Sequence, residues 1–448
     1  MTTRKEFLAA SAALAAVGDA SGGRALPVGN GGASGDRALP GGAQLVAPAT
    51  GGSQPPPRNR HPYQGIDWTT AQQIRGTTHM HCKTQEDLDV ILRRIEFLTL
   101  SNYYPSAPWY PLAKMTENYY RLHHDFPVTV AKKRVEGPFD WNKIVGQWIK
   151  DLPPELQKEY PFKEGGKIFK PLPEDILEAP NAEHHNFYYG NGTRIPRLHM
   201  NSPGSLFASG TFDQWERRRF QTGVRGGYDF GSGELWSTAI DRMIEGLMYP
   251  DGGGVTINHP VWSSYYRPLI LSILDHDPRV LGMEVIEGGH ANGEKYWDWV
   301  LATGRQCFGF FVPDHSIRRP DDSFGVNVLV TPERSVHACL KAYRDGNFYG
   351  ALRGLNELKF TRISFHDTTV EAETDKPARL EVITGVGKVK ETTGTSVKWT
   401  MEGQYAWSGR RNEAHVFARI KAYALDGSGE ELFSQPYMLV PNSSGLAK

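Results

Sequence analysis

Between residues 61 and 355, short apolar runs alternate with stretches in which apolar residues recur at helical spacing. Residues 86–100 (EDLDVILRRIEFLTL) predict a helix that starts on acidic residues and leads into a buried strand. Residues 236–254 predict a helix that ends at Pro and Gly, and residues 253–260 a strand that ends at a proline. Residues 267–289 predict another helix followed by a strand. This alternation favours an α/β fold with a parallel sheet or barrel.

Two segments depart from the alternation. Residues 104–180 are rich in Tyr, Trp and Pro, and we expect an inserted lid or cap there. Residues 356–448 alternate apolar and polar positions and turn at Gly and Asp, which predicts a small β-sandwich. The sequence therefore predicts a main α/β domain over 61–355, interrupted by the insert and followed by a β-domain.

The first residues predict a processed segment. Arg4 and Lys5 precede the apolar run FLAASAALAAVG, so we interpret residues 1–25 as an export signal and 26–60 as a Gly- and Pro-rich linker. The stretch TRKEFL resembles a twin-arginine signal with Lys5 in place of the second arginine, which leaves the export route open. No other segment approaches the ~18 apolar residues of a membrane span. We expect a periplasmic or extracellular protein without an integral membrane segment in the mature chain.

Charge and composition exclude one class of partner. Lys+Arg and Asp+Glu both number 50, so no basic field favours nucleic acid. Aromatic residues make up 11% of the chain, which fits both a well-packed core and a surface for a small-molecule or glycan-linked substrate. The three cysteines show no metal-finger spacing.

The stretch RGTTHMHCKT, residues 75–84, carries two histidines one residue apart. On a strand, His79 and His81 would point to the same face. Two neutral imidazoles on one face are good ligands for a divalent metal, although a pair of surface histidines would give the same pattern.

Further histidines and carboxylates follow along the chain. Glu183 lies in NAEHHNF, His199 in RLHMNSPGS, His259 in TINHPVW and Asp314 in FVPDHSI. The last three lie at or just after strand-like segments, where the active sites of α/β folds collect. Histidines and carboxylates from separate strand ends are what a dinuclear metal site uses.

The order His-x-His, Glu, His, His-Pro and a terminal Asp motif resembles the PHP (polymerase and histidinol phosphatase) superfamily of metal-dependent hydrolases. The sequence is similar above all to the secreted branch related to carbaryl hydrolase, whose members carry a C-terminal β-domain. The similarity covers about residues 70–440, and YPDGGGVTINHP, MEVIEGG and TPERSVHACLKAYRDGNFYG are its most specific stretches. The resemblance implies a distorted (β/α)7 barrel with up to three metals.

The resemblance also implies two cation subsites that share one bridging carboxylate. The first subsite would consist of His79, His81, Glu183 and Asp314, and the second of Glu183, His199 and His259. Such ligands take Zn, Mn or Fe. Two divalent cations lower the pKa of a shared water and polarise the phosphoryl or carbonyl oxygen of a substrate.

Departures from the family pattern fall on its third subsite. The family has Thr-Asp-His where residues 101–103 read Ser-Asn-Tyr, and Asp-x-His where residues 314–316 read Asp-His-Ser. The carboxylate after His-x-His survives as Glu86 or Asp87. Because both missing histidines belong to one subsite, we expect two metals rather than three.

Several residues near these motifs are candidates for catalysis or substrate binding. Asp314 could orient the nucleophile, and His315 is a candidate general acid, a displaced ligand or a loop histidine bonded to the backbone. Asn102 and Tyr103 stand where the third metal would be, and Tyr103 could line a wall around a sugar or aromatic group or pack in the lid. Arg318 could bind an anionic substrate or remain a solvated charge.

The leading hypothesis is an exported metal-dependent phosphoesterase acting on a small or glycosylated phosphate ester. A hydrolase of carbamates, amides or other esters is the second hypothesis. The third is a non-catalytic carbohydrate-binding protein with a degenerate site. The retained bridging glutamate argues against an inert binder, and the altered third subsite argues against ordinary phosphomonoester hydrolysis.

Overall fold

We describe the fold from a computed structural model of the chain. The described residues are 61–81, 85–101, 172–184, 187–193, 195, 197–205, 235–287, 292–314, 324–352, 357–401 and 416–439. The predicted export signal, the linker and most of the predicted insert lie outside these residues and remain predictions. Among the described helices, none has the length and apolar character needed to cross a membrane.

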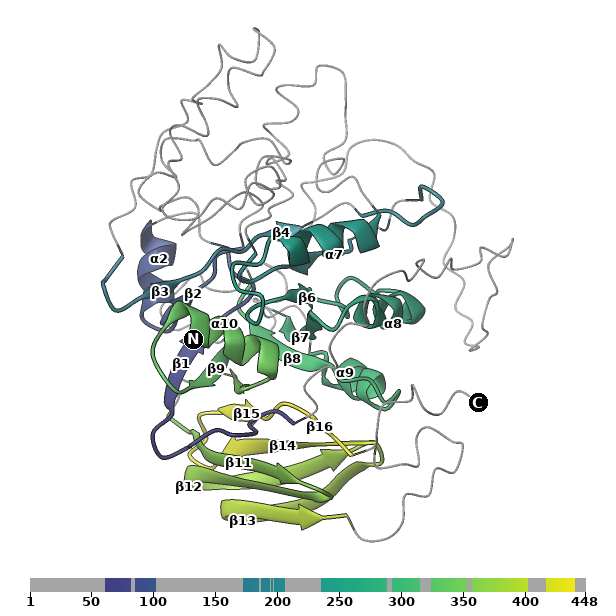
Figure 1. Ribbon diagram of the computed structural model, residues 1–448. Coiled ribbons are helices and arrows are strands. Elements are labelled where there is room, and N and C mark those ends of the chain that lie inside the picture. The colour runs from purple at the N-terminus through teal and green to yellow at the C-terminus, as the bar shows by residue number, and fades with distance from the viewer. Residues whose placement is uncertain are drawn as a thin grey trace, which may run out of the picture. The chain divides into compact units, whose positions relative to one another are not determined.

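The described part of the chain has a mixed α/β fold with two sheets (Figure 1). The smaller sheet has the order β4 (Glu183–His184), β5 (Met200–Asn201), β6 (Val255–Ile257), β7 (Val280–Glu287) and β8 (Phe308–Val312). Strands β6, β7 and β8 are parallel, whereas β5 runs antiparallel to both of its neighbours. Helices α7 (Trp236–Glu245), α8 (Arg267–His276) and α9 (Glu294–Leu301) pack around it.

The larger sheet joins strands from both halves of the chain. Its N-terminal and central strands are β3 (Leu177–Glu178), β2 (Phe97–Leu98), β1 (Gln72–Gly76), β9 (Gly325–Thr331) and β10 (Phe348–Leu352), in that order. The order continues through β15 (Glu431–Phe433), β14 (Phe417–Ala424), β12 (Thr369–Thr384) and β11 (Phe360–His366). Two further strands, β13 (Gly387–Thr400) and β16 (Tyr437–Met438), pair with β12 and β14. Helix α2 (Gln85–Leu92) follows β1.

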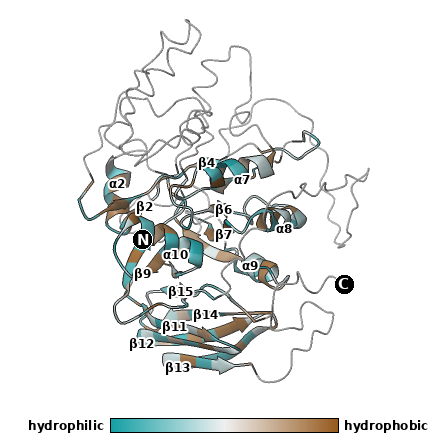
Figure 2. Cartoon of the chain, in the orientation of Figure 1, coloured by the Kyte–Doolittle hydropathy of each residue, from teal (hydrophilic) through white to brown (hydrophobic). Residues whose placement is uncertain are grey.

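Burial follows the apolar pattern of the sequence. All residues of β7 and β9 are buried, and these strands carry mainly apolar side chains (Figure 2). Helix α10 (Val336–Asp345) begins where Ser335 accepts a hydrogen bond from the Ala338 N–H and ends at Gly346, which has φ +74°. A Cβ at Gly346 would lie 2.5 Å from the Phe308 ring, so both the backbone angle and the packing require glycine there.

The described strands do not form the distorted (β/α)7 barrel that the resemblance implies. One edge of β1 pairs with β2, and its other edge is occupied by the antiparallel strand β9 over Gln72–Gly76, so β8 cannot pair along β1. Beyond the strand ends, the His81 N–H donates to the Asp314 carbonyl oxygen (3.3 Å) and the Asp314 N–H to that of His79 (3.0 Å). Strand β8 also packs against the larger sheet, where the Phe311 N–H donates to Asn327 Oδ1 of β9 (2.9 Å). Among the described residues, the result is two open sheets that pack against each other.

The C-terminal strands continue the larger sheet. Strand β15 pairs antiparallel with β10 from Gly350 to Leu352, so the predicted β-domain is hydrogen-bonded to the α/β part. Arg419 of β14 also reaches α9, with its Nε 2.8 Å from Asp298 Oδ1 and its Nη2 3.3 Å from Glu294 Oε2. The Arg419 side chain is only 2% exposed. This buried cation therefore links the β-strands to the helical layer.

We expect Arg419→Ala to lower the free energy of unfolding by about 3 kcal/mol, because removing this buried cation leaves Asp298 without its partner, whereas Glu294 keeps Lys421. Arg362→Ala is the control, since the Arg362 and Glu373 side chains are both 51% exposed and their charged atoms are 3.7 Å apart. An exposed pair contributes less than about 1 kcal/mol. Urea denaturation measures both losses, and equal losses would contradict the role assigned to Arg419.

Candidate metal centre

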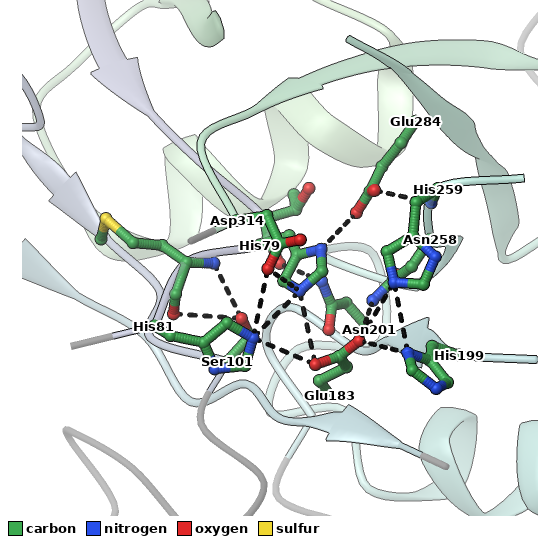
Figure 3. A network of polar contacts seen from close by, with 12 residues as sticks. His79, His81, Ser101, Glu183, His199, Asn201, Asn258, His259, Glu284 and Asp314 are labelled. Carbon is green, nitrogen blue, oxygen red and sulfur yellow. Dashed lines mark hydrogen bonds and ion pairs between the residues drawn. The ribbon is translucent and has the colours of Figure 1, made fainter. Parts of the chain in front are cut away.

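The two histidines of the His-x-His motif converge on one point (Figure 3). Both follow the end of β1 and are buried, and their Nε2 atoms lie 3.2 Å apart. Met80 lies between them and points elsewhere, into the apolar core. The alternation predicted from the sequence therefore places both imidazoles together.

Two carboxylates face this pair. Glu183 Oε2 lies 3.0 Å from His81 Nε2 and 3.4 Å from His79 Nε2. Asp314 Oδ1 lies 3.2 Å from His79 Nε2 and 3.4 Å from His81 Nε2. We call these four side chains the first group.

The other oxygen of Glu183 faces a second pair of histidines. Glu183 Oε1 lies 2.8 Å from His199 Nδ1 and 3.4 Å from His259 Nε2, and these two nitrogens are 3.2 Å apart. We call Glu183, His199 and His259 the second group. Glu183 is 2% exposed and presents one oxygen to each group. The structure thus brings together all six residues that the sequence predicts as ligands.

Hydrogen bonds on the far side of the rings fix which nitrogen faces each group. His79 Nδ1 lies 2.7 Å from Glu284 Oε1, and a carboxylate can only accept, so Nδ1 carries the proton. His259 Nδ1 lies 2.8 Å from Ser263 Oγ, whose hydroxyl donates to the Arg197 carbonyl oxygen at 3.3 Å. The Nε2 atoms of His79 and His259 are then left to face the carboxylate oxygens.

This donor set fits a divalent cation. His79 Nε2 faces Glu183 and Asp314, so only a positive charge between these atoms, either a proton or a metal ion, can balance them. Three combinations have ligand atoms within 4.8 Å of one another and could hold a metal ion, namely His79–His81–Glu183, His79–His259–Asp314 and Glu183–His199–His259. Imidazole nitrogens with carboxylate oxygens suit Zn, Mn or Fe.

The charge environment of His79 indicates how the site would respond to pH. Burial alone would lower the pKa of His79, but the carboxylates of Asp314, Glu284 and Glu183 together raise that pKa well above its usual value. At neutral pH a proton therefore occupies Nε2, the atom that a cation would need. Cation and proton compete for the same position.

We expect metal binding at pH 7 to release about one proton, and metal affinity to fall as the pH falls. Titration calorimetry of the metal-free protein with Zn²⁺, in two buffers of different ionisation enthalpy, measures the release. The heat should differ between the buffers by the ionisation enthalpy of about one proton. Equal heats in both buffers would contradict the raised pKa of His79.

Sequence reasoning missed Glu284, which is fully buried in β7. Its second oxygen accepts the main-chain N–H of His259 at 2.7 Å, so one carboxylate holds a residue of each group. His259 has φ +27° and Asp314 φ +47°, angles that non-glycine residues rarely adopt. A charged residue in the middle of the buried strand VLGMEVIE was the available signal.

A second residue that the sequence reasoning missed is Asn258, whose Nδ2 lies 3.3 Å from Glu183 Oε1. Ser101, which stands in place of the family's threonine, accepts a hydrogen bond from the Met80 N–H at 2.8 Å. Its role here is to hold the segment between the two histidines. Glu86 is exposed on α2, and the side chain of Asp87 lies outside the described residues.

The remaining predicted site residues are Asn102, Tyr103, His315 and Arg318, and all four lie outside the described residues. The altered third subsite and the roles proposed for these side chains stay predictions.

Comparison with known proteins adds little to this geometry. No family model matches the chain, and no curated protein matches it. It is similar to a solved two-domain protein from Bacteroides vulgatus that contains a predicted PHP-like metal-dependent phosphoesterase. The identity is 13%, the TM-score is 0.34, and the match covers 83% of this chain and 95% of that one. Likeness at this level carries no argument about fold or function.

Proposed function

We propose that this protein is a metal-dependent hydrolase with two cation subsites bridged by Glu183. The observation that carries the proposal is the position of this buried carboxylate, whose two oxygens each face a separate pair of histidines. A carboxylate that only accepted a hydrogen bond from one histidine would not need a second pair of histidines at its other oxygen. The fixed ring orientations of His79 and His259 support the same conclusion.

Divalent cations at such a centre supply Lewis acidity, which activates water and stabilises negative charge on a substrate oxygen. The protein's own groups prepare the site for them. Glu284 keeps the proton of His79 on Nδ1, and Ser263 does the same for His259. Asp314 lies against His79 and His81, where its second oxygen could orient a water molecule. Burial of these groups keeps bulk water away from the charges.

The substrate class we propose is a phosphate ester, with a diester favoured over a monoester because the family's third subsite is altered in this sequence. We also propose membership of the PHP superfamily, on the order and spacing of the motifs and on the grouping of their side chains. Its closed (β/α)7 barrel is not part of this proposal, because the described strands form two open sheets. Export remains a proposal supported by the pattern of residues 1–25.

Metal analysis and turnover on one sample test the proposed function. The purified mature protein is stripped with chelator, reloaded with Zn²⁺, Mn²⁺ or Fe²⁺, and measured for metal content and for hydrolysis of bis-(p-nitrophenyl) phosphate. We expect two metal ions per chain and turnover that rises with loading. His337→Ala is the control, because His337 is a half-exposed histidine paired with Asp251, outside both groups.

The outcomes separate the hypotheses. Two ions without turnover of the phosphodiester would move the proposal to carbamate, amide or carboxyl ester hydrolysis. A protein that takes up no metal from any of the three solutions would overturn the hydrolase and favour the carbohydrate-binding alternative.

A further inference from the structure

An exposed tryptophan lies directly against the second group. Trp262 comes three residues after His259, and the centroids of the two rings are 4.9 Å apart with an angle of 81° between their planes. Trp262 is 43% exposed, whereas His259 is buried. A single exposed tryptophan needs no explanation by itself. This one is in contact with a candidate metal ligand and also with solvent.

An arginine lies over the same indole ring. The guanidinium carbon of Arg197 is 5.5 Å from the Trp262 ring centroid, which is within the range of a cation–π contact. Arg197 is exposed and stands two residues before His199, the other histidine of the second group. Within the described part of the chain, no carboxylate forms an ion pair with it. One cation and one aromatic ring thus flank the same subsite.

Hydrogen bonds hold the two loops together before any ligand binds. The Arg197 carbonyl oxygen accepts bonds from Ser263 Oγ and from the Tyr265 hydroxyl. The same Tyr265 oxygen accepts the His199 N–H at 2.9 Å. The main chain that carries the pair is therefore tied to the candidate ligands, so the two loops need not be ordered when a ligand binds.

A buried carboxylate fixes the indole side of the pair. Glu287 accepts the N–H of Val261 at 2.8 Å and that of Trp262 at 2.9 Å. Burial raises the pKa of Glu287 to about 7, and the two N–H donors oppose this rise. These two bonds anchor the loop that carries Trp262 to strand β7.

We propose that Arg197 and Trp262 form a substrate-binding platform that selects esters whose non-reacting part carries a flat ring with a negative charge. An indole stacks against a flat ring, and a guanidinium binds carboxylate or phosphate oxygens through paired N–H groups. The inference rests on the proposed function, because the platform acts only if the reacting group sits at the adjacent subsite.

Three phosphodiesters with the same leaving group test the platform. Each carries one p-nitrophenyl ester and a second ester that is methyl, phenyl or 4-carboxyphenyl. For the metal-loaded wild type we expect kcat/KM to rise about tenfold from methyl to phenyl and about tenfold again to 4-carboxyphenyl, each step equivalent to about 1.4 kcal/mol. Trp262→Ala should abolish the kcat/KM ratio of the phenyl to the methyl diester. Arg197→Met should abolish the ratio of the 4-carboxyphenyl to the phenyl diester.

A matched pair elsewhere on the surface supplies the control. The guanidinium carbon of Arg267 lies 4.6 Å from the Trp299 ring centroid, in a cation–π contact between α8 and α9. Neither residue belongs to the two groups. Arg267→Met and Trp299→Ala should keep both ratios of the wild type. Unchanged ratios in Trp262→Ala and Arg197→Met, with an active wild type, would overturn the platform and leave the hydrolase standing.

If the wild type turns over none of the three diesters, that result contradicts the phosphodiesterase proposal but does not test the platform. In that case, binding measurements test the platform. Methylphosphonate, phenylphosphonate and 4-carboxyphenylphosphonate are titrated calorimetrically into the metal-loaded protein. The same two tenfold steps in Kd, lost in Trp262→Ala and Arg197→Met respectively, would support the platform. Equal affinities of the wild type for all three phosphonates would overturn it.

Discussion

Replacing Glu183 by Gln is expected to release both metal ions and to lower turnover by more than about a hundredfold. Loss of a group that only orients a metal ligand typically costs about tenfold to a hundredfold, and a bridging ligand should cost more. The physical reason is that Glu183 gives one oxygen to each group, at 3.0 Å from His81 Nε2 and 2.8 Å from His199 Nδ1. Glutamine has one oxygen and no charge. One group therefore loses its oxygen, and the other keeps a neutral oxygen in place of a charged one. The measurement is metal content after dialysis, with turnover on the same sample.

Glu178→Gln is the matched control for this substitution. Glu178 is a half-buried glutamate in β3 and belongs to neither group. Burial raises the pKa of Glu178 to about 7. Metal content and turnover should stay at the wild-type level. Two tightly bound ions in Glu183→Gln would show that this residue is not the bridge.

The second large effect is expected at a residue that belongs to neither group. Glu284→Gln should weaken binding of metal by about tenfold to a hundredfold at both subsites. Glu284 accepts the Nδ1–H of His79 and the main-chain N–H of His259, and glutamine has one oxygen for these two donors. Loss of the second bond also leaves the left-handed backbone of His259 without its partner. Competition with a fluorescent zinc chelator measures both dissociation constants.

Glu287→Gln separates this role from a general effect of removing a buried charge. Glu287 lies in the same strand, three residues further on, and accepts the N–H groups of Val261 and Trp262. Those donors belong to no candidate ligand, so Glu287→Gln should keep its metal affinity within about threefold, below the range for groups that orient ligands. If both variants lose metal equally, Glu284 acts through the stability of the strand rather than through His79 and His259.

Much of the local structure could be predicted from the sequence. The segment 267–289 predicts a helix and then a strand, and the structure has α8 followed by β7. The segment 331–350 predicts a helix that stops at Asp-Gly, and α10 ends at Gly346. Such signals are local, because a cap or a stop depends on neighbours along the chain. The mixed α/β class was predicted for the same reason.

The sheet order could not be predicted in this way. Strand β9 takes the edge of β1 through contacts between residues more than 250 positions apart, such as Gln72 and Thr331, and no local pattern specifies that partner. This pairing is why the described strands form two open sheets instead of the distorted (β/α)7 barrel that the resemblance implies. The resemblance supplied the barrel, and the alternation of strands and helices is compatible with both arrangements.

The candidate ligands illustrate the same division. His79 and His81 could be paired from their spacing alone, and the structure places their Nε2 atoms together. Glu284 could not be assigned a role, because its two bonds depend on how β7 aligns with the segments that carry His79 and His259. Arg197 and Trp262 meet through loops that precede β5 and follow β6, so their contact depends on tertiary structure.

The pairing of β15 with β10 determines how the chain can be divided. A chain shortened after residue 355 would lose β15 and expose the hydrogen-bonding edge of β10 from Gly350 to Leu352. An open edge of this kind invites pairing with a second molecule, and natural proteins protect against such aggregation. The C-terminal strands thus cover an edge of the sheet that leads to His79 and His81, and we expect a fragment without them to self-associate through that edge.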